Sequence, residues 1–133
     1  MSLTPDLRAL VQAAGALQGK FSLEDDFTAG AVACALRTPA GSVYTGICLD
    51  FACGIGFCAE HAAVAEMLKH RETRIDAIVA VGKRGILSPC GRCRELMLQV
   101  DAASANAQII LRGDRIMRLS ELLPEHWLDE DEA

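Results

Sequence analysis

The first segment of the chain carries apolar residues at the spacing of one helix face. Thr4 can cap such a helix, and Pro5 suits its first turn, where a missing N–H leaves no bond unmade. Gly19 suits its end. The pattern predicts a helix over residues 5–17, whose apolar face is formed by Leu3, Leu7, Leu10, Val11, Ala14 and Leu17.

Short segments further along have the length and composition of β-strands. Residues 30–38 and 42–49 flank Pro39-Ala40-Gly41, and two strands around such a turn predict a hairpin. Residues 75–83 are largely apolar, which is typical of a strand buried on both faces. Two further strands are predicted at residues 108–112 and 115–119, while residues 85–89 are predicted to form a loop.

Two more helices are predicted at residues 59–70 and 90–101, and Pro124 ends a last helical turn over residues 120–123. The resulting order, α-β-β-α-β-α-β-β, is typical of a mixed sheet with helices on its faces. A length of 133 residues favours one domain that spans the whole chain. Residues 129–133 are predicted to be a frayed acidic tail.

Composition and charge narrow the classes of function. Hydrophobic residues make up 51% of the chain, too many for a disordered protein, yet no apolar run is long enough to cross a bilayer. The chain opens without a basic and apolar leader, so we expect a cytoplasmic protein with no membrane partner. The formal net charge of −5 argues against a nucleic-acid partner, because grooves that bind nucleic acid are basic. We therefore expect a small-molecule substrate.

Six cysteines in such a protein indicate thiol or metal chemistry before disulfides. Cys34 and Cys48 fall in predicted strands, and we interpret them as small core residues. The other four fall at junctions between turns and helices. Two segments there, Cys58-Ala59-Glu60 and Pro89-Cys90-Gly91-Arg92-Cys93, coincide with the starts of predicted helices. Free N–H groups and the helix dipole stabilise thiolates at such positions.

Three of these thiols, Cys58, Cys90 and Cys93, can share one Zn²⁺. Three protein ligands leave the fourth tetrahedral position for water, which is the arrangement of a catalytic zinc. Glu60 lies two residues after Cys58, so its carboxylate can reach the open side of the metal and carry protons there. The alternative is a structural zinc site with Cys53 as the fourth ligand. Four thiolates would leave no position for water on the metal, and Glu60 would then have no catalytic role.

A longer series of segments resembles the small homotetrameric zinc cytidine deaminases, in the same order and at similar spacing. The series consists of Phe27-Thr28-Ala29-Gly30-Ala31, Gly41-Ser42-Val43-Tyr44-Thr45-Gly46, Cys58-Ala59-Glu60, Pro89-Cys90-Gly91-Arg92-Cys93-Arg94 and Leu122-Leu123-Pro124. The resemblance implies a cytidine deaminase-like, three-layer α-β-α domain with a mixed, roughly five-stranded sheet. It also implies a homotetramer.

The resemblance further implies the reaction and the contacts with the substrate. Zinc and Glu60 would remove the amino group of a cytosine-type base by hydrolysis, converting cytidine or deoxycytidine to uridine or deoxyuridine with release of ammonia. The backbone N–H of Ala59 and the carbonyl of Ser88 would hold the amino-bearing edge of the base. Phe27 would pack near the base and sugar, and Trp127 would reach into the site of a neighbouring subunit.

The chain departs from the family at the positions that hold the ribose. An Asn and a Glu two residues apart usually do so, and a gap-free alignment places Ile47 and Leu49 there, whose side chains cannot hydrogen-bond a sugar. Asp50 is one residue away and could substitute only if the loop shifts. Cys53 also replaces a Tyr. Two alternatives stay open: a deaminase of another aminated pyrimidine or heterocycle, such as blasticidin S, or a binding homologue without activity.

The charge of the zinc site needs compensation. Three thiolates on Zn²⁺ leave a net negative charge, which disfavours activation of water unless positive charge or hydrogen bonds offset it. Arg94 keeps its family position, Arg92 is close in sequence, and His61 stands where the family often has Arg. We expect Arg94 and the two helix N-termini to offset the charge, with His61 either assisting them or lying on the surface.

Overall fold

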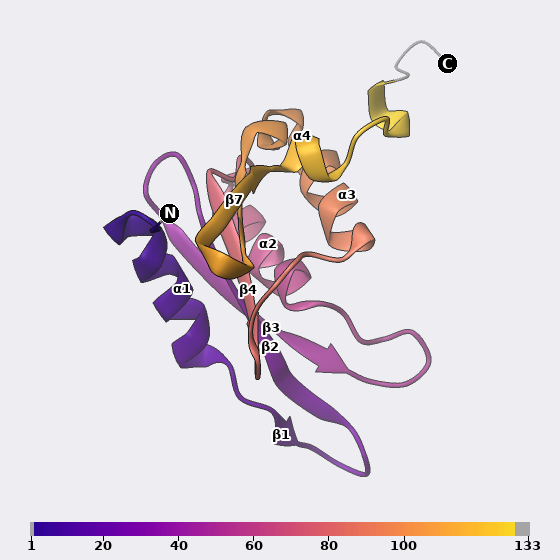
Figure 1. The fold of residues 1–133 in the computed structure, drawn as a ribbon. Helices are drawn as coiled ribbons and strands as arrows, with labels where there is room; N and C mark the ends of the chain where they lie inside the picture. The colour runs from indigo at the N-terminus through magenta and orange to yellow at the C-terminus, as the bar shows by residue number, and fades with distance from the viewer. Residues whose placement is uncertain (1, 130–133) are drawn as a thin grey trace.

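A mixed sheet of seven strands forms the middle layer of the molecule (Figure 1). The computed structural model describes residues 2–129. The strands are β1 (Phe21–Ser22), β2 (Thr28–Arg37), β3 (Val43–Asp50), β4 (Ala77–Gly82), β5 (Gly85–Leu87), β6 (Gln108–Leu111) and β7 (Arg115–Arg118). The α-helices are α1 (Pro5–Leu17), α2 (Ala59–Lys69), α3 (Gly91–Val100) and α4 (Leu119–Leu122), and the 3₁₀ helices are η1 (Ala102–Asn106), η2 (Arg112–Asp114) and η3 (Trp127–Asp129).

Most elements lie within two residues of the bounds expected from the sequence. α1 has the expected bounds because Thr4 Oγ1 accepts a hydrogen bond from the Leu7 N–H at 3.4 Å and Pro5 opens the helix. The sheet has more strands than expected. β1 has no predicted counterpart, and β5 occupies part of the segment predicted as a loop. Both are short strands that pair with β2 and β4, respectively, so their partners rather than their own composition define them.

β2 and β4 are the central strands of the sheet. β2 pairs antiparallel with β1, β3 and β4. β4 pairs antiparallel with β5 and parallel with β6, which in turn pairs antiparallel with β7. The chain passes from β4 to β6 through β5 and α3, because parallel neighbours need a crossover. All six residues of β4 are buried, as predicted for a strand that is covered on both faces.

Helices cover both faces of the sheet, so the domain has the predicted three layers (Figure 1). On one face, α1 buries Leu7, Leu10 and Ala14 against residues of β2, β4 and β6. On the other face, α2 and α3 bury Met67 and Met97 in a separate core cluster. The sheet thus separates α1 from α2 and α3, and both cysteine segments lie on the side of α2 and α3.

Gly46 of β3 allows α2 to approach the sheet closely. A Cβ at this position would lie 2.5 Å from the nitrogen of Ala63 and 2.7 Å from the carbonyl oxygen of Ala59. Real Cβ atoms essentially never come so close to backbone atoms, so any side chain here would displace the helix. The contact fixes the first turn of α2, where Cys58 and Glu60 lie.

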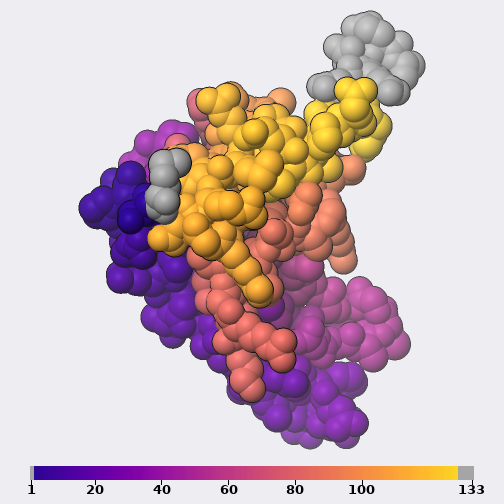
Figure 2. Space-filling model, viewed as in Figure 1, coloured from indigo at the N-terminus to yellow at the C-terminus, as the bar shows by residue number. Residues whose placement is uncertain are grey.

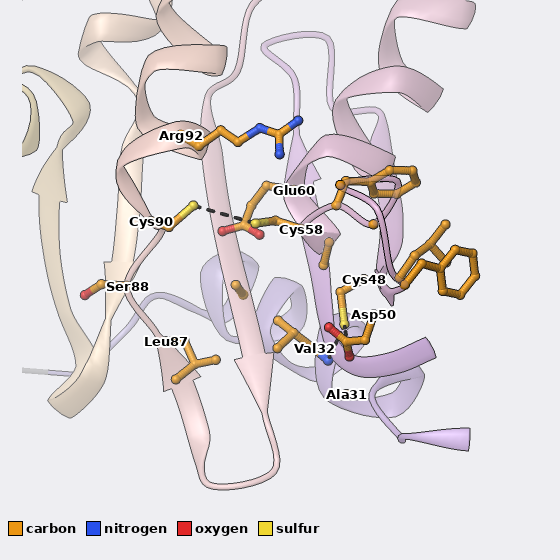
Figure 3. A pocket seen from close by; sticks show the side chains of 17 residues that line it. Ala31, Val32, Cys48, Asp50, Cys58, Glu60, Leu87, Ser88, Cys90 and Arg92 are labelled. Carbon is orange, nitrogen blue, oxygen red and sulfur yellow. Dashed lines mark hydrogen bonds between the residues drawn. The ribbon is translucent and has the colours of Figure 1, made fainter. Parts of the chain in front are cut away.

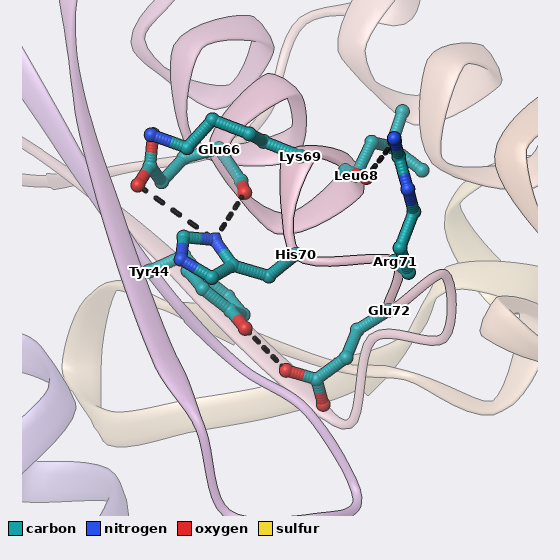
Figure 4. A network of polar contacts seen from close by, with 7 residues as sticks. All are labelled: Tyr44, Glu66, Leu68, Lys69, His70, Arg71 and Glu72. Atoms are coloured by element: carbon teal, nitrogen blue, oxygen red, sulfur yellow. Dashed lines mark hydrogen bonds and ion pairs between the residues drawn. The ribbon is translucent and has the colours of Figure 1, made fainter.

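A polar network ties the other end of α2 to the hairpin of β2 and β3 (Figure 4). The carboxylate of Glu72 accepts hydrogen bonds from the hydroxyl of Tyr44 and, at 2.6 Å, from the hydroxyl of Thr38. The bond from Thr38, followed by the bond from Tyr44, lowers the pKa of the Glu72 carboxyl. The ring of His70, which caps α2, lies 5.1 Å from the ring of Tyr44 between centroids. The helix is therefore anchored at both ends.

The last described segment stands out from the body of the molecule. η3 follows Pro124 and projects away from the rest of the domain in the space-filling view (Figure 2). Trp127, its first residue, is 60% exposed. Of the predicted acidic tail, only Asp129 is described, as the last residue of η3, and residues 130–133 lie outside the described residues. Within residues 2–129, no helix has both the length and the apolar character needed to span a membrane.

Candidate metal centre and adjoining pocket

Three cysteine thiols from two helix starts meet in one cluster. Cys58 is the N-cap of α2, Cys90 is the N-cap of α3, and Cys93 lies in the first turn of α3. The Sγ atom of Cys90 lies 3.6 Å from that of Cys58 and 3.4 Å from that of Cys93, and all three sulfurs lie within 4.8 Å of one another. Sulfurs bound to a tetrahedral Zn²⁺ are separated by about 3.8 Å. The cluster therefore has the donor atoms and the spacing of a three-ligand zinc site.

The pKa of the Cys90 thiol shifts downward, whereas burial raises the pKa of the Cys58 and Cys93 thiols. Neither Cys58 nor Cys90 makes a side-chain capping bond to its own helix. Burial raises the pKa of the Cys90 thiol, but hydrogen bonds with the backbone and thiol of Cys93 and with the thiol of Cys58 outweigh it, and the net shift is downward. Burial, followed by the charge of Glu60, raises the pKa of the Cys93 thiol. A divalent cation would reverse that shift, because coordination deprotonates a thiol.

Glu60 is a buried carboxyl beside the thiol cluster. It lies in the first turn of α2 and is only 4% exposed. Figure 3 shows its carboxylate next to the Cys58 side chain, on the wall of a pocket that Cys90 also lines. Burial raises the pKa of this carboxyl. A carboxyl with a raised pKa can hold a proton in one step and release it in the next, which suits a general acid and base.

A pocket of about 510 Å³ opens beside the thiols and Glu60 (Figure 3). Its walls come from β2, from the end of β3 and the loop that follows, from the start of α2, from Ala80 of β4, and from the segment between the end of β5 and the first turn of α3. Ala59 and Ser88, the residues expected to hold the amino-bearing edge of a base, both line it. Of the other lining residues, seven are aliphatic or aromatic and three, Asp50, Glu60 and Arg92, carry ionisable groups other than thiols. A pocket of this size and character suits a small heterocyclic ligand.

The end of β3 presents Cys48 and Asp50 to the pocket (Figure 3). Side chains alternate along a strand, so these two share a face that Ile47 and Leu49 do not. Ile47 lies outside the pocket lining, and Leu49 lines it where its backbone pairs with Phe57 through bonds of 3.0 and 3.1 Å. Of the two positions that a gap-free alignment assigns to the sugar, Ile47 thus lies outside the pocket lining and Leu49 within it, between Cys48 and Asp50.

Hydrogen bonds hold the side chains of Cys48 and Asp50. A register shift between Ala29 and Ala33 makes a bulge in β2 opposite this part of β3. From the bulge, the N–H of Val32 donates to Sγ of Cys48 at 3.3 Å. The Thr28 hydroxyl donates to Oδ2 of Asp50 at 3.4 Å. Asp50, expected from the sequence as a substitute sugar contact only if the loop shifts, is therefore a positioned polar group in the pocket. The register of β3 places it there without such a shift.

Three residues singled out in the sequence lie outside the pocket lining. Phe27 packs on Phe51, with ring centroids 5.8 Å apart, and Phe51 in turn lines the pocket. Trp127 lies on η3, away from this pocket. Cys53 is exposed, has a left-handed φ of 61°, and is not part of the thiol cluster. Among the cysteines of the described chain, three and not four come together, so a zinc ion held by them would keep one tetrahedral position for water.

The two side chains expected to offset the thiolate charge have different surroundings. Arg94 donates from Nε to the carbonyl of Pro89 at 2.8 Å and from Nη1 to the carbonyl of Leu122 at 2.9 Å, which ties the start of α3 to α4. His61 lies closer to the thiols, with Nδ1 3.6 Å from Sγ of Cys93. Burial, followed by the charge of Arg92, lowers the pKa of His61.

Arg92 lines the pocket although the sequence assigned it no separate role. It lies in the first turn of α3, and Figure 3 shows its side chain extending toward α2, above Cys58 and Glu60. The signal available in the sequence was its place between Cys90 and Cys93.

Comparison with known proteins identifies relatives of this chain. Residues 6–108, which include both cysteine segments, match the family model of the cytidine and deoxycytidylate deaminase zinc-binding region. The cytidine deaminase of Mycobacterium tuberculosis (strain ATCC 25618 / H37Rv) is 33% identical over 97 residues, which cover 71% of this chain and 71% of that protein. The crystal structure of cytidine deaminase from Mycobacterium leprae matches with a TM-score of 0.76 and 25% identity, covering 92% of this chain and 100% of that chain. The cytidine deaminase structure from Burkholderia pseudomallei matches with a TM-score of 0.72 and 30% identity, covering 92% and 98%.

Proposed function

The chain belongs to the cytidine and deoxycytidylate deaminase family, and on that premise we propose that it hydrolytically deaminates cytidine and deoxycytidine to uridine and deoxyuridine. The observation that carries the proposal is the buried Glu60 beside three thiols that lie within 4.8 Å of one another, on the wall of a pocket of ligand size. Hydrolytic deamination requires a metal site and a proton-carrying carboxylate on the same wall.

We assign Cys58, Cys90 and Cys93 as the zinc ligands and Glu60 as the proton carrier. Zinc, when bound, supplies a water that is activated for attack at neutral pH. Glu60 accepts the proton of the water that adds to the amino-bearing ring carbon, and it passes that proton to the ring nitrogen. A second proton travels through the same carboxyl to the departing amine, which leaves as ammonia. Its burial beside the thiols supports this role.

Ala59 and Ser88 are the proposed contacts of the base. The N–H of Ala59 is at the first position of α2, where it has no partner within the helix, so it can donate to an acceptor on the ring. The carbonyl of Ser88 can accept from the amino group. Both residues line the pocket beside Glu60. Phe27 would act through Phe51, on which it packs.

Asp50 is the proposed contact of the sugar. Its carboxylate lines the same pocket as Glu60, and the Thr28 hydroxyl holds one of its oxygens. A carboxylate accepts hydrogen bonds from sugar hydroxyls, so it can take the role that Ile47 and Leu49 cannot. The neighbouring Cys48, a weak hydrogen-bonding group, stands where a second polar contact would be expected.

Because Cys48 is a weak hydrogen-bonding group, a different substrate for the same deamination reaction is the favoured alternative. A substrate with another aminated pyrimidine or heterocycle, such as blasticidin S, would use the zinc ligands and Glu60 in the same way but make different contacts with Cys48 and Asp50. The Asp50 carboxylate would favour a substrate that brings a hydroxyl or a cationic group to this wall, and it would disfavour a phosphate.

We also propose that the protein is a cytoplasmic homotetramer. All six cysteines are free thiols, which suits a reducing compartment. Large apolar side chains are exposed on the described chain, including Phe21, Ile55 and Trp127, and such residues mark contact surfaces when they gather. Trp127 would complete the site of a neighbouring subunit. Light scattering coupled to size exclusion tests the assembly: a tetramer is expected, and a monomer at assay concentration would contradict it.

The test of the function is ammonia release by the zinc-loaded protein, offered cytidine, deoxycytidine, cytosine and blasticidin S side by side. Turnover of the two nucleosides at an ordinary enzymatic rate is the expected result. Turnover of only blasticidin S or cytosine would support the proposed chemistry but would show that the two nucleosides are not the substrates. No ammonia release from any of the four compounds would contradict the proposed activity on cytosine-type rings.

A further inference from the structure

The bulge in β2 forms part of the pocket wall beside Asp50. Between two paired positions, β2 advances from residue 29 to residue 33 while β3 advances only from residue 49 to residue 47. Residues 30–32 of β2 therefore lie opposite Cys48 alone. Figure 3 shows two of them, Ala31 and Val32, on the same side of the pocket as Cys48 and Asp50. A bulge disrupts the ladder and leaves backbone groups without strand partners.

The other edge of β2 also lacks strand partners at the bulge. In the described chain, β2 pairs with β1 through residues 28–29 and with β4 through residues 33–37. Residues 30–32 lie between these two pairings. Gly30 is buried and its two neighbours in the bulge are half-buried, so their backbone N–H and carbonyl groups need partners from elsewhere in the protein.

The end of α1 supplies partners for two carbonyls of the bulge. Gln18, the C-cap of α1, donates from Nε2 to the carbonyl of Ala31 at 3.0 Å. The N–H of Gly19 donates to the carbonyl of Gly30 at 2.9 Å. Gly30 has a φ of 83°, and a Cβ there would lie 2.4 Å from the carbonyl oxygen of Gly19, so this approach requires glycine. Of the two bonds, the one from Gln18 comes from a side chain and can be removed by substitution.

The peptide group between Ala31 and Val32 connects this contact with the pocket. Its carbonyl oxygen accepts the hydrogen bond from Gln18, and its N–H donates to Sγ of Cys48 at 3.3 Å. A peptide group is planar and rigid, so a bond that fixes the oxygen also fixes the direction of the N–H. The Cys48 sulfur in turn lies 3.9 Å from Oδ2 of Asp50. A chain of contacts thus runs from Gln18 to the wall of the pocket.

We propose that Gln18 is a positioning residue for the sugar-binding wall, because it orients the peptide group that holds Cys48 beside Asp50. Gln18 lies outside the pocket lining and belongs to the end of α1, so it acts through the bulge and not by contact with the substrate. The inference rests on the proposed function in that it takes the wall at the end of β3 as the contact of the sugar.

The first test follows the reactivity of Cys48 and needs no turnover. The zinc-loaded protein is treated with iodoacetamide, and alkylation of Cys48 is measured by peptide mapping. Cys48 is only 6% exposed, so its reaction reports local opening of the wall. Gln18→Met removes the donor at similar length and should speed alkylation about fivefold, the factor expected for loss of one neutral hydrogen bond.

Two further variants control for the donor and for the helix. Gln18→Lys keeps an N–H donor on a side chain of sufficient length, so it should restore the slow alkylation of Cys48. Gln12→Met makes the same exchange at an exposed position of α1 and should react at the wild-type rate.

The second test measures binding of the sugar-bearing substrate. Protection of Cys48 from iodoacetamide by cytidine gives the dissociation constant without turnover, and steady-state kinetics give KM and kcat. Gln18→Met should raise the dissociation constant and KM about fivefold, again the factor for one hydrogen bond. It should leave zinc content and kcat unchanged, because the thiols and Glu60 lie on the other wall. Gln18→Lys should restore the affinity.

The outcomes separate this inference from the proposed function. Unchanged alkylation of Cys48 in Gln18→Met would overturn the inference, since the bulge would then not depend on the donor. Faster alkylation with unchanged cytidine affinity would also overturn it, as would equal effects in Gln12→Met. Absence of cytidine turnover by the wild-type protein would instead contradict the proposed function, while the dissociation constants would still decide the role of Gln18.

Discussion

The two walls of the pocket differ in how their functional groups are positioned. On the metal side, the thiols and Glu60 lie at the starts of α2 and α3. The close contact at Gly46 fixes the start of α2, and the hydrogen bond from Arg94 to the carbonyl of Pro89 fixes the start of α3. On the β3 side, Cys48 and Asp50 lie at the end of a strand, opposite a bulge in β2 and before an irregular loop. The first wall is built from regular helix starts, and the second depends on strand register.

This difference separates reaction from specificity. Bond breaking needs the metal ligands and the proton carrier at fixed distances, and helix starts provide both the geometry and favourable N–H groups. Recognition of the rest of the substrate can vary without disturbing that geometry. The groups that we assign to the chemistry, the thiols and Glu60, lie on the metal side, while Cys48 and Asp50 lie on the β3 side. Variants of one wall should therefore leave the groups of the other wall intact.

The largest effect is expected from removal of a metal ligand. Cys90→Ala should abolish stoichiometric zinc binding and with it detectable deamination, because only two thiols would remain. Cys53→Ala is the matched control, since Cys53 is exposed and outside the thiol cluster. Zinc content by elemental analysis and ammonia release report on both variants. Loss of zinc from the Cys53 variant would contradict the three-ligand site and favour a closed structural one.

A smaller effect that leaves zinc in place is expected on the β3 side. Asp50→Asn should raise KM for cytidine roughly tenfold, because hydrogen bonds to a charged group contribute about 1.5–3 kcal/mol. Zinc content should stay at the wild-type level. Asp6→Asn, which removes a carboxylate from α1 on the opposite face of the sheet, should leave KM unchanged. A wild-type KM in the Asp50 variant would remove this residue from substrate recognition.

The metal side could be predicted from the sequence, whereas the β3 side could not. Cys58 and Cys90 fall at helix starts that their own neighbours indicate, so local pattern was enough to place them. The direction of Cys48 and Asp50 depends on the register of β3 and on a bulge between Ala29 and Ala33, which arise from pairing between distant segments. Sequence spacing alone therefore could not decide which of these side chains face the pocket.

The same physical reason explains the elements that the sequence missed. α1 was predicted with its observed bounds because Thr4 and Pro5 act locally. β1 and β5 are only two and three residues long, and each becomes a strand through its partner. Such strands have no periodicity to detect, so the sheet was predicted with too few strands.

The smallest effect is expected at the far end of α2, away from both walls. Glu72→Gln should lower the free energy of unfolding at pH 7 without changing zinc content or KM. The pKa of Glu72 is lowered in the folded protein by the hydroxyls of Thr38 and Tyr44, so its stabilising contribution is complete above its unfolded pKa of about 4.3 and is lost as the pH falls through its folded pKa. The stability difference between wild type and variant should therefore shrink on acidification. Urea unfolding at several pH values measures it, and a difference that grows below pH 4 would contradict this account.

Glu60 is proposed to carry the protons of the reaction at a zinc centre held by three thiols. Ammonia release per bound zinc, measured for wild type and Glu60→Gln with cytidine, tests it most directly. We expect equal zinc content in the two proteins and a rate reduced by about a hundredfold or more in the variant, since a positioned general acid and base contributes about 10²–10⁴ to the rate. An unchanged rate at equal zinc content would contradict the account.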